Sequence, residues 1–218
     1  MQDEQRPAVR PENTTPASWD ERYRGGRRFS QHPNGVLLAE VADLPAGRAL
    51  DVGAGEGADA RWLARRGWEV TAVDFSGVAL ARAAADAEEL EGADVAGRVR
   101  WVRQDLTVSP PPAGVFDLVS AQYFPLHRSS GPGPSPALRG LLDAVAPGGT
   151  LLVVGHELTE LVSRLHDVDP EDYDQPADVA RMLDDGWEVL VDETLPRTAP
   201  APPGSHHTHD TVLRARRR

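Results

Sequence analysis

A glycine-rich turn that follows Asp51 is the part of the sequence whose residue types and spacing point most directly to chemistry. The turn holds three glycines and one small residue between them, at Gly53, Ala54, Gly55 and Gly57. It follows an apolar run that predicts a strand and precedes a pattern that predicts a helix. Glycine lets the backbone approach a ligand closely, because no Cβ stands in the way. The turn therefore predicts a nucleotide-containing cofactor, and alone it also fits a dinucleotide.

Three acidic residues in or just after the predicted strands indicate which ligand the turn binds. Asp74 ends the second predicted strand, where a carboxylate can accept both ribose hydroxyl protons of an adenosine, and Asp105 follows the third strand, where an adenine amino group can be recognised. Asp51 lies within the first strand, at a position that is usually apolar in dinucleotide folds. Each acid alone has a simpler interpretation as a helix cap or loop residue. Their joint placement favours an adenosine cofactor other than a dinucleotide.

These residues need a sheet to position them, and short apolar runs alternating with longer helical patterns predict one. Such alternation is typical of a parallel sheet with crossover helices. We expect a short front helix with Ser18 as its N-cap, and Pro147-Gly148-Gly149 as the turn before the fifth strand. The strands are expected at 49–52, 69–73, 99–103, 116–121, 150–154, 187–192 and 211–216, and the helices at 18–23, 34–41, 59–66, 78–90, 136–145 and 177–183.

The turn, the acids and the order of elements together resemble the class I methyltransferases over roughly residues 19–216. This resemblance implies S-adenosylmethionine as cofactor and methyl transfer as the reaction. It also implies a three-layer α/β/α sandwich around a seven-stranded, mainly parallel sheet, in which the antiparallel last strand lies between the fifth and the sixth. The opening Trp19-Asp20-Glu21-Arg22-Tyr23 is similar to the small-molecule branch that includes thiopurine and tellurite-resistance methyltransferases.

The resemblance assigns a role to most of the candidate cofactor residues. The assignments are Gly53, Ala54, Gly55 and Gly57 at the methionine portion, Asp51 at its amino group, Asp74 on the ribose, Asp105 near the adenine, and Phe75 and Leu106 flanking the adenine ring. Three further residues are candidates from their type and position alone: Gln122 could orient an acceptor beside the cofactor, Tyr23 could belong to a cover over the cofactor or to the core, and Arg28 could meet the cofactor carboxylate or an anionic substrate.

Histidines are the candidate bases on the acceptor side. An antiparallel last strand begins at the edge where parallel strands end, so the run 205–210 is expected near the cofactor, together with His127 and His156. One of His127, His156, His207 and His209 would then act as general base near neutral pH. His207 and His209 would share a strand face and could hold a metal ion, although methyl transfer requires none. The simpler alternative is that they only cap the strand.

The composition of the chain argues against several classes of binding partner and chemistry. The chain has 218 residues, 23 basic residues that are all arginine, 34 acids and a net charge of −11, which argues against nucleic acid. The absence of cysteine excludes disulfides and thiolate chemistry, and no apolar run approaches about 18 residues. We expect a cytoplasmic protein with a disordered lead at 1–16, a single domain at 17–218 and a small-molecule acceptor. An NAD-type oxidoreductase and a non-catalytic S-adenosylmethionine-binding module are the alternatives.

Overall fold

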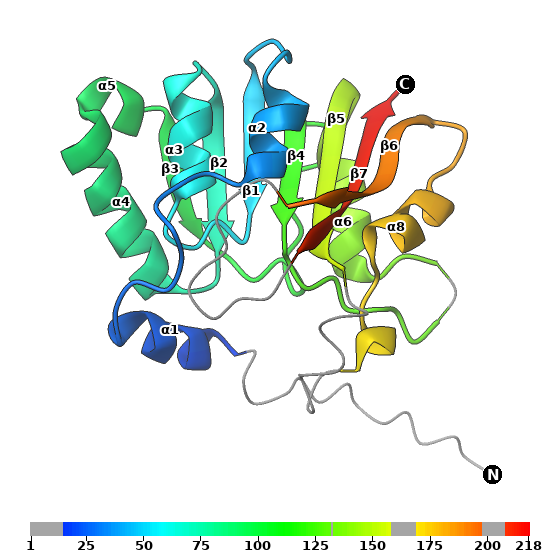
Figure 1. Cartoon of the computed structure of the whole chain (residues 1–218), viewed down its shortest axis with the longest axis horizontal. Coiled ribbons are helices and arrows are strands. Elements are labelled where there is room, and N and C mark those ends of the chain that lie inside the picture. The colour runs from blue at the N-terminus through cyan, green and yellow to red at the C-terminus, as the bar shows by residue number, and fades with distance from the viewer. Residues whose placement is uncertain (1–14, 132, 158–168, 198–207) are drawn as a thin grey trace.

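The computed structural model describes residues 15–131, 133–157, 169–197 and 208–218. Figure 1 shows the arrangement of its elements. In chain order they are α1 (Pro16–Arg24), α2 (Gly35–Val41), β1 (Arg48–Val52), α3 (Ala58–Arg65), β2 (Glu69–Asp74), α4 (Gly77–Glu91), α5 (Ala93–Ala96), β3 (Val99–Arg103), β4 (Phe116–Gln122), α6 (Pro136–Ala144), β5 (Val145–His156), the 3-10 helix η2 (Pro170–Asp172), α8 (Pro176–Met182), β6 (Trp187–Pro196) and β7 (His209–Arg217).

The strands form one seven-stranded sheet in the order β3-β2-β1-β4-β5-β7-β6. Strands β1 to β5 pair in parallel, whereas β7 runs antiparallel to both of its neighbours. The last strand therefore lies between the fifth and the sixth, as expected. This topology confirms the predicted fold class, and it brings the carboxyl ends of β1, β2 and β4 to one edge.

Apolar residues cover both faces of the sheet and make the fold three-layered. One face packs a cluster that includes Leu37 of α2 and Leu63 of α3. The opposite face packs a separate cluster that includes Leu138 of α6 and Val179 of α8. All four side chains are fully buried. The central strands are apolar on both sides because helices cover them on both faces.

The front helix begins earlier than the sequence pattern indicates. Thr15, not Ser18, is the N-cap of α1: its side chain accepts a hydrogen bond from the Ser18 backbone, and the Ser18 side chain contacts the Thr15 backbone in return. This reciprocal pair is a capping box, which explains why Ser18 looked like a cap. Pro16 occupies the first turn, where its missing N–H costs no helix hydrogen bond. In Figure 1, α1 lies beyond the arrowheads of β2 and β4.

Strand β5 is longer than predicted and begins directly after α6. Val145 pairs with Phe116, the register then shifts, and regular pairing resumes between Leu118 and Thr150. The predicted turn at 147–149 is therefore an irregular part of β5 rather than a loop before it. Gly148 has a φ of 77° there, which a glycine adopts without strain. Within the described ranges, no helix has both the length and the apolar character needed to cross a membrane.

Candidate functional site

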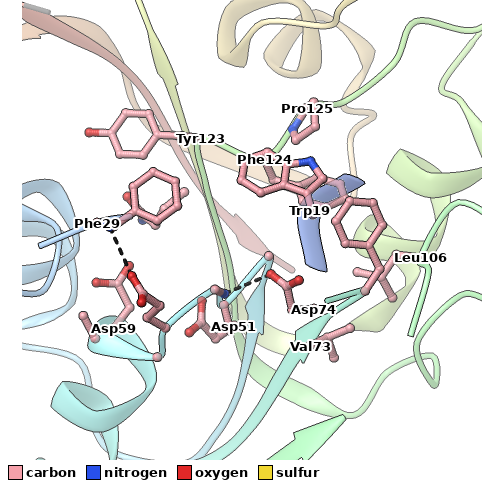
Figure 2. Close-up of a pocket in the computed structure, with 18 of the residues that line it drawn as sticks. Trp19, Phe29, Asp51, Asp59, Val73, Asp74, Leu106, Tyr123, Phe124 and Pro125 are labelled. Carbon is pink, nitrogen blue, oxygen red and sulfur yellow. Dashed lines mark hydrogen bonds between the residues drawn. The ribbon is translucent and has the colours of Figure 1, made fainter. Parts of the chain in front are cut away.

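A pocket of about 460 Å³ opens at the carboxyl edge of β1, β2 and β4. Figure 2 shows Asp51, Asp59 and Asp74 along its floor, with Phe29 on one side and Phe124 on the other. The predicted cofactor residues that line it are Tyr23, Asp51, Gly53, Ala54, Gly55, Gly57, Asp74, Phe75, Asp105, Leu106 and Gln122. Most of the residues expected to bind the cofactor therefore surround one cavity.

The glycine turn has a backbone conformation that other residues would adopt only with strain. Gly53, Gly55 and Gly57 have φ values of 71°, 53° and 76°. A Cβ on Gly57 would lie 2.5 Å from the Trp101 ring, so the close packing of the turn against β3 also requires glycine. The turn is held to β2 by the backbone N–H of Gly53, which donates to the Val73 carbonyl at 2.8 Å. The three glycines thus combine a conformational and a steric requirement.

Asp51 is the most unusual group on the pocket floor. Its side chain is 2% exposed, and Oδ2 has no hydrogen-bond partner among the described residues. Burial, together with the nearby charges of Asp59 and Asp74, raises the pKa of the Asp51 carboxyl group well above its ordinary value. A buried polar oxygen without a partner is costly. An ammonium group entering the pocket would supply both the missing donor and the missing positive charge, so the site fits the amino end of S-adenosylmethionine.

Asp74 fixes the turn and faces the same pocket. Its Oδ2 accepts a hydrogen bond from the Gly55 backbone at 2.9 Å, and its Oδ1 accepts one from the Ser76 backbone at 2.8 Å. Burial raises the pKa of Asp74, and these two backbone donors oppose the rise. Each carboxylate oxygen has capacity for a further donor. The group can therefore hold the turn and also receive the hydroxyls of a ribose.

Asp105 and Leu106 lie beyond β3, at the end of the pocket farther from Asp51 (Figure 2 labels Leu106). The Oδ1 atom of Asp105 accepts hydrogen bonds from the backbone and the hydroxyl of Thr107, at 3.0 and 2.6 Å. Leu106 is 5% exposed, and Phe75 also lines this region. An acid beside apolar and aromatic surface suits a flat heterocycle with an exocyclic amine.

The end of β4 forms the opposite wall. The Nε2 atom of Gln122 donates to Ser120 Oγ at 3.1 Å, and its Oε1 has no partner among the described residues. Tyr123 has a φ of 54°, which is unusual for a residue with a side chain. Its hydroxyl donates to Asp210 Oδ1 at 2.9 Å, and its ring stacks on His156 with 4.3 Å between centroids. Such strain persists only where surrounding contacts fix it, often at functional sites.

The predicted histidines separate into different environments. His127 lines the pocket and packs against Tyr173, with ring centroids 4.7 Å apart. His156 stacks on Tyr123 and does not line the cavity, while His209 is exposed on β7 with Nδ1 2.8 Å from Thr208 Oγ1. His207 lies outside the described residues. Within the described ranges, no group of three potential ligands could hold a metal ion. The metal site predicted at His207 and His209 includes a residue outside those ranges and stays a prediction.

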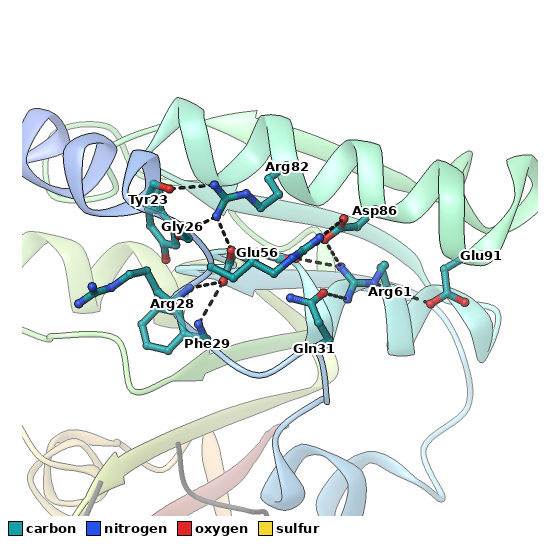
Figure 3. A network of polar contacts seen from close by, with 11 residues as sticks. Tyr23, Gly26, Arg28, Phe29, Gln31, Glu56, Arg61, Arg82, Asp86 and Glu91 are labelled. Atoms are coloured by element: carbon teal, nitrogen blue, oxygen red, sulfur yellow. Dashed lines mark hydrogen bonds and ion pairs between the residues drawn. The ribbon is translucent and has the colours of Figure 1, made fainter. Parts of the chain in front are cut away.

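The segment that joins α1 to α2, residues 25–34, forms the cover of the pocket. We call it the α1–α2 segment. Phe29 and His32 of this segment line the cavity, as does Tyr23 at the end of α1. Arg28 is exposed and does not line the pocket, and Figure 3 shows its guanidinium extending away from Glu56. The role predicted for Arg28 at the cofactor carboxylate thus stays a prediction.

The sequence pattern missed several residues of the site. Among them, Glu56 and Asp59 line the pocket and contact the α1–α2 segment, and His32 lines it as well. For Glu56 and Asp59 the available signal was their position within and directly after the glycine turn. Nothing in the local sequence indicates that His32 folds back over the turn, because that depends on long-range contacts of the segment.

Comparisons with known proteins agree with this geometry. Residues 49–149 match a family model described as a methyltransferase domain. A trans-aconitate 2-methyltransferase from Sinorhizobium fredii is 35% identical over 122 residues, which are 54% of this chain and 41% of that protein. The chain spans about half the length of the curated relatives it matches.

Two solved structures share the fold. One, described in connection with conversion of a disulfide bond into a thioacetal group during echinomycin biosynthesis, has a TM-score of 0.67 and 24% identity, with 92% of each chain covered. The magnesium protoporphyrin IX methyltransferase of Synechocystis, with S-adenosylmethionine bound, has a TM-score of 0.58 and 19% identity over 84% of this chain and 76% of that one. These likenesses establish the fold.

Proposed function

We propose that this chain is a class I methyltransferase that transfers a methyl group from S-adenosylmethionine to a small-molecule acceptor. The observation that carries the proposal is the buried Asp51 carboxyl group, whose Oδ2 has no partner among the described residues. It lies beside a glycine turn with three left-handed glycines. A zwitterionic, adenosine-containing ligand matches this arrangement of acid, turn and apolar pocket better than a dinucleotide does.

Each residue would bind a different part of the cofactor. The Asp51 carboxylate would bind the ammonium group, and the backbone around Gly53 would approach the methionine portion. Asp74 would accept hydrogen bonds from the ribose hydroxyls, while Asp105 would accept from the adenine amino group and Leu106 would pack on its ring. These roles follow from the family resemblance, and the shared pocket supports them.

When bound, S-adenosylmethionine would supply a methyl group activated by a sulfonium, so the protein has to align the acceptor and exclude water. That methyl group would pass to the acceptor atom as the carbon–sulfur bond breaks, which would leave S-adenosylhomocysteine. Phe124 and Tyr123 would wall the reacting atoms. His127, which lines the pocket, is our preferred base for the acceptor proton, and His32 lies on the same cavity.

A small acceptor is supported by the size of the pocket and by the cover that the α1–α2 segment forms over it. The relative named trans-aconitate 2-methyltransferase makes carboxylic acids a first class to test. We keep the thiopurine and tellurite-resistance branch as a second class, based on the opening Trp19-Asp20-Glu21-Arg22-Tyr23. The class of compound that accepts the methyl group will show whether the acceptor atom is oxygen, nitrogen or sulfur.

Calorimetric titration with S-adenosylmethionine, S-adenosylhomocysteine and NAD tests the cofactor. We expect both sulfur compounds to bind and NAD not to bind. Binding of NAD alone would refute the proposal in favour of an oxidoreductase. Release of S-adenosylhomocysteine with a panel of acids, phenols, amines and thiols then separates an enzyme from a binding module, which would retain the cofactor site yet transfer no methyl group.

A further inference from the structure

The Glu56 side chain joins the glycine turn to the segment that covers the pocket. Its backbone belongs to the turn between Gly55 and Gly57, and its side chain is buried, with 4% exposure. Its Oε2 accepts hydrogen bonds from the backbone N–H groups of Arg28 and Phe29, each at 3.1 Å. One carboxylate thus contacts two consecutive amides of the α1–α2 segment (Figure 3).

Arg82 of α4 completes this contact. Its Nη1 donates to Glu56 Oε1 at 2.6 Å and to the Gly26 carbonyl at 2.9 Å, while its Nη2 donates to the Tyr23 carbonyl at 2.8 Å. The guanidinium therefore holds the end of α1, the start of the segment and the glycine turn together. Hydrogen bonds to ionised partners are the stronger kind. We call Glu56 and Arg82 the latch.

Two further contacts lie between the latch and α2. Arg61 donates to the Glu56 carbonyl at 2.9 Å and to Gln31 Oε1 at 3.0 Å. Asn34 donates to both oxygens of Asp59, from its backbone at 2.8 Å and its side chain at 2.7 Å. These contacts fix the part of the segment nearest α2, whereas the latch fixes its start and its middle, beside the pocket-lining Phe29.

We propose that Glu56 is a positioning residue for the cofactor: through the latch it holds the α1–α2 segment closed over the pocket, so that cofactor binding and segment closure stabilise each other. The inference rests on the proposed function. Its physical basis is that Phe29 and His32 of this segment line the pocket, and that the residue that holds the segment there belongs to the glycine turn of the same pocket. Coupling of this kind is reciprocal.

The test measures amide hydrogen exchange at Arg28 and Phe29 by NMR, in the full chain, with and without S-adenosylhomocysteine. In Glu56→Ala we expect both amides to exchange at least about tenfold faster without ligand, because their acceptor is gone. We also expect the Kd for S-adenosylhomocysteine to rise about tenfold. In the unmodified protein the ligand should slow exchange at both amides further, and in the variant this slowing should be lost.

Glu40→Gln is the matched control, because Glu40 is a largely buried acid that pairs with Arg214 at 3.2 Å, and neither side chain bonds to the segment or the latch. It should leave the exchange of both amides and the Kd within about twofold of the unmodified protein. Glu56→Gln keeps the size of the side chain and gives a second reading if Glu56→Ala does not fold. We expect it to weaken protection and affinity in the same direction.

The possible failures are distinguishable. Unchanged exchange at Arg28 and Phe29 in both Glu56 variants would overturn the latch. Faster exchange with an unchanged Kd, or with the ligand-induced slowing intact, would make Glu56 merely structural and overturn its positioning role. If the unmodified protein bound no S-adenosylhomocysteine, the proposed function would fail and the cofactor coupling with it, whereas the ligand-free exchange would still report on the latch.

Discussion

Replacing Asp51 with asparagine should stabilise the ligand-free protein while removing its affinity for the cofactor. The buried Oδ2 has no partner among the described residues, and Asp59 and Asp74 oppose ionisation of the group. A tenfold change in the ionisation constant of an acid corresponds to about 1.4 kcal/mol. Because the native protein raises the pKa of Asp51 well above its ordinary value, a side chain of the same shape that cannot ionise should recover about 1 kcal/mol or more at neutral pH. In a chain of this length that corresponds to a rise in Tm of roughly 2–4 °C per kcal/mol.

The affinity for the cofactor should decrease in the same variant. A hydrogen bond to a charged group contributes about 1.5–3 kcal/mol, so the Kd of Asp51→Asn for S-adenosylhomocysteine should rise roughly 10- to 150-fold. Affinity in the unmodified protein should increase with pH as Asp51 ionises, because the ammonium requires the carboxylate. Asp51→Asn should lose that pH dependence.

The stability of the ligand-free protein should also depend on pH through this group. Because the native pKa of Asp51 lies above its unfolded value near 3.8, the native state retains a proton that the unfolded state has lost. Its contribution to the free energy of unfolding is therefore complete at low pH. It declines as pH rises from the unfolded pKa through the raised native one. Asp51→Asn should lack this decline.

Thermal unfolding from acidic to neutral pH, with calorimetric titration of S-adenosylhomocysteine, measures both effects. Asp192→Asn on β6 is the control, because it removes one exposed negative charge far from the pocket. It should change Tm and Kd little, which separates a local effect at Asp51 from the relief of net charge. A lower Tm for Asp51→Asn at neutral pH, or an unchanged Kd, would refute the reasoning about this carboxyl group.

Two further substitutions test the packing around the pocket. Gly57→Ala adds a Cβ that would lie 2.5 Å from an indole carbon at a φ of 76°. Its free energy of unfolding should fall by at least about 1 kcal/mol more than that of Gly114→Ala, where φ is 66° and nothing lies within 4 Å of the added Cβ. Equal losses would mean that backbone strain alone matters. Tyr123→Phe removes a donor from the buried Asp210 and should cost about 1–2 kcal/mol in thermal unfolding. Tyr173→Phe, whose hydroxyl bonds no described residue, should cost less, and an equal cost would argue against the Tyr123 contact.

Much of the fold could be predicted because local periodicity and sheet topology constrain each other. Strand 99–103 matches β3, and the reversed last strand lies where the family pattern puts it. Errors arose where contacts are reciprocal or irregular: Ser18 resembled a cap because it is half of a capping box, and 147–149 resembled a turn because β5 is irregular there. Sequence patterns indicate that such residues have a particular structural role, but they do not show which residue each one contacts.

The first two residues of β7, His209 and Asp210, show why the acceptor side resists prediction. Successive side chains of a strand point to opposite faces, so His209 and Asp210 cannot both face the sheet interior. The structure buries Asp210, with 3% exposure, and leaves His209 exposed. The start of β7 therefore acts on the pocket through Tyr123: Asp210 accepts a hydrogen bond from the Tyr123 hydroxyl. Arg197 donates to the Tyr123 hydroxyl at 3.2 Å and to the Asp210 carboxylate at 3.3 Å. The residue of β7 that fixes Tyr123 in the pocket wall is thus the carboxylate Asp210. The residue types alone had favoured a histidine for a role on this side of the pocket.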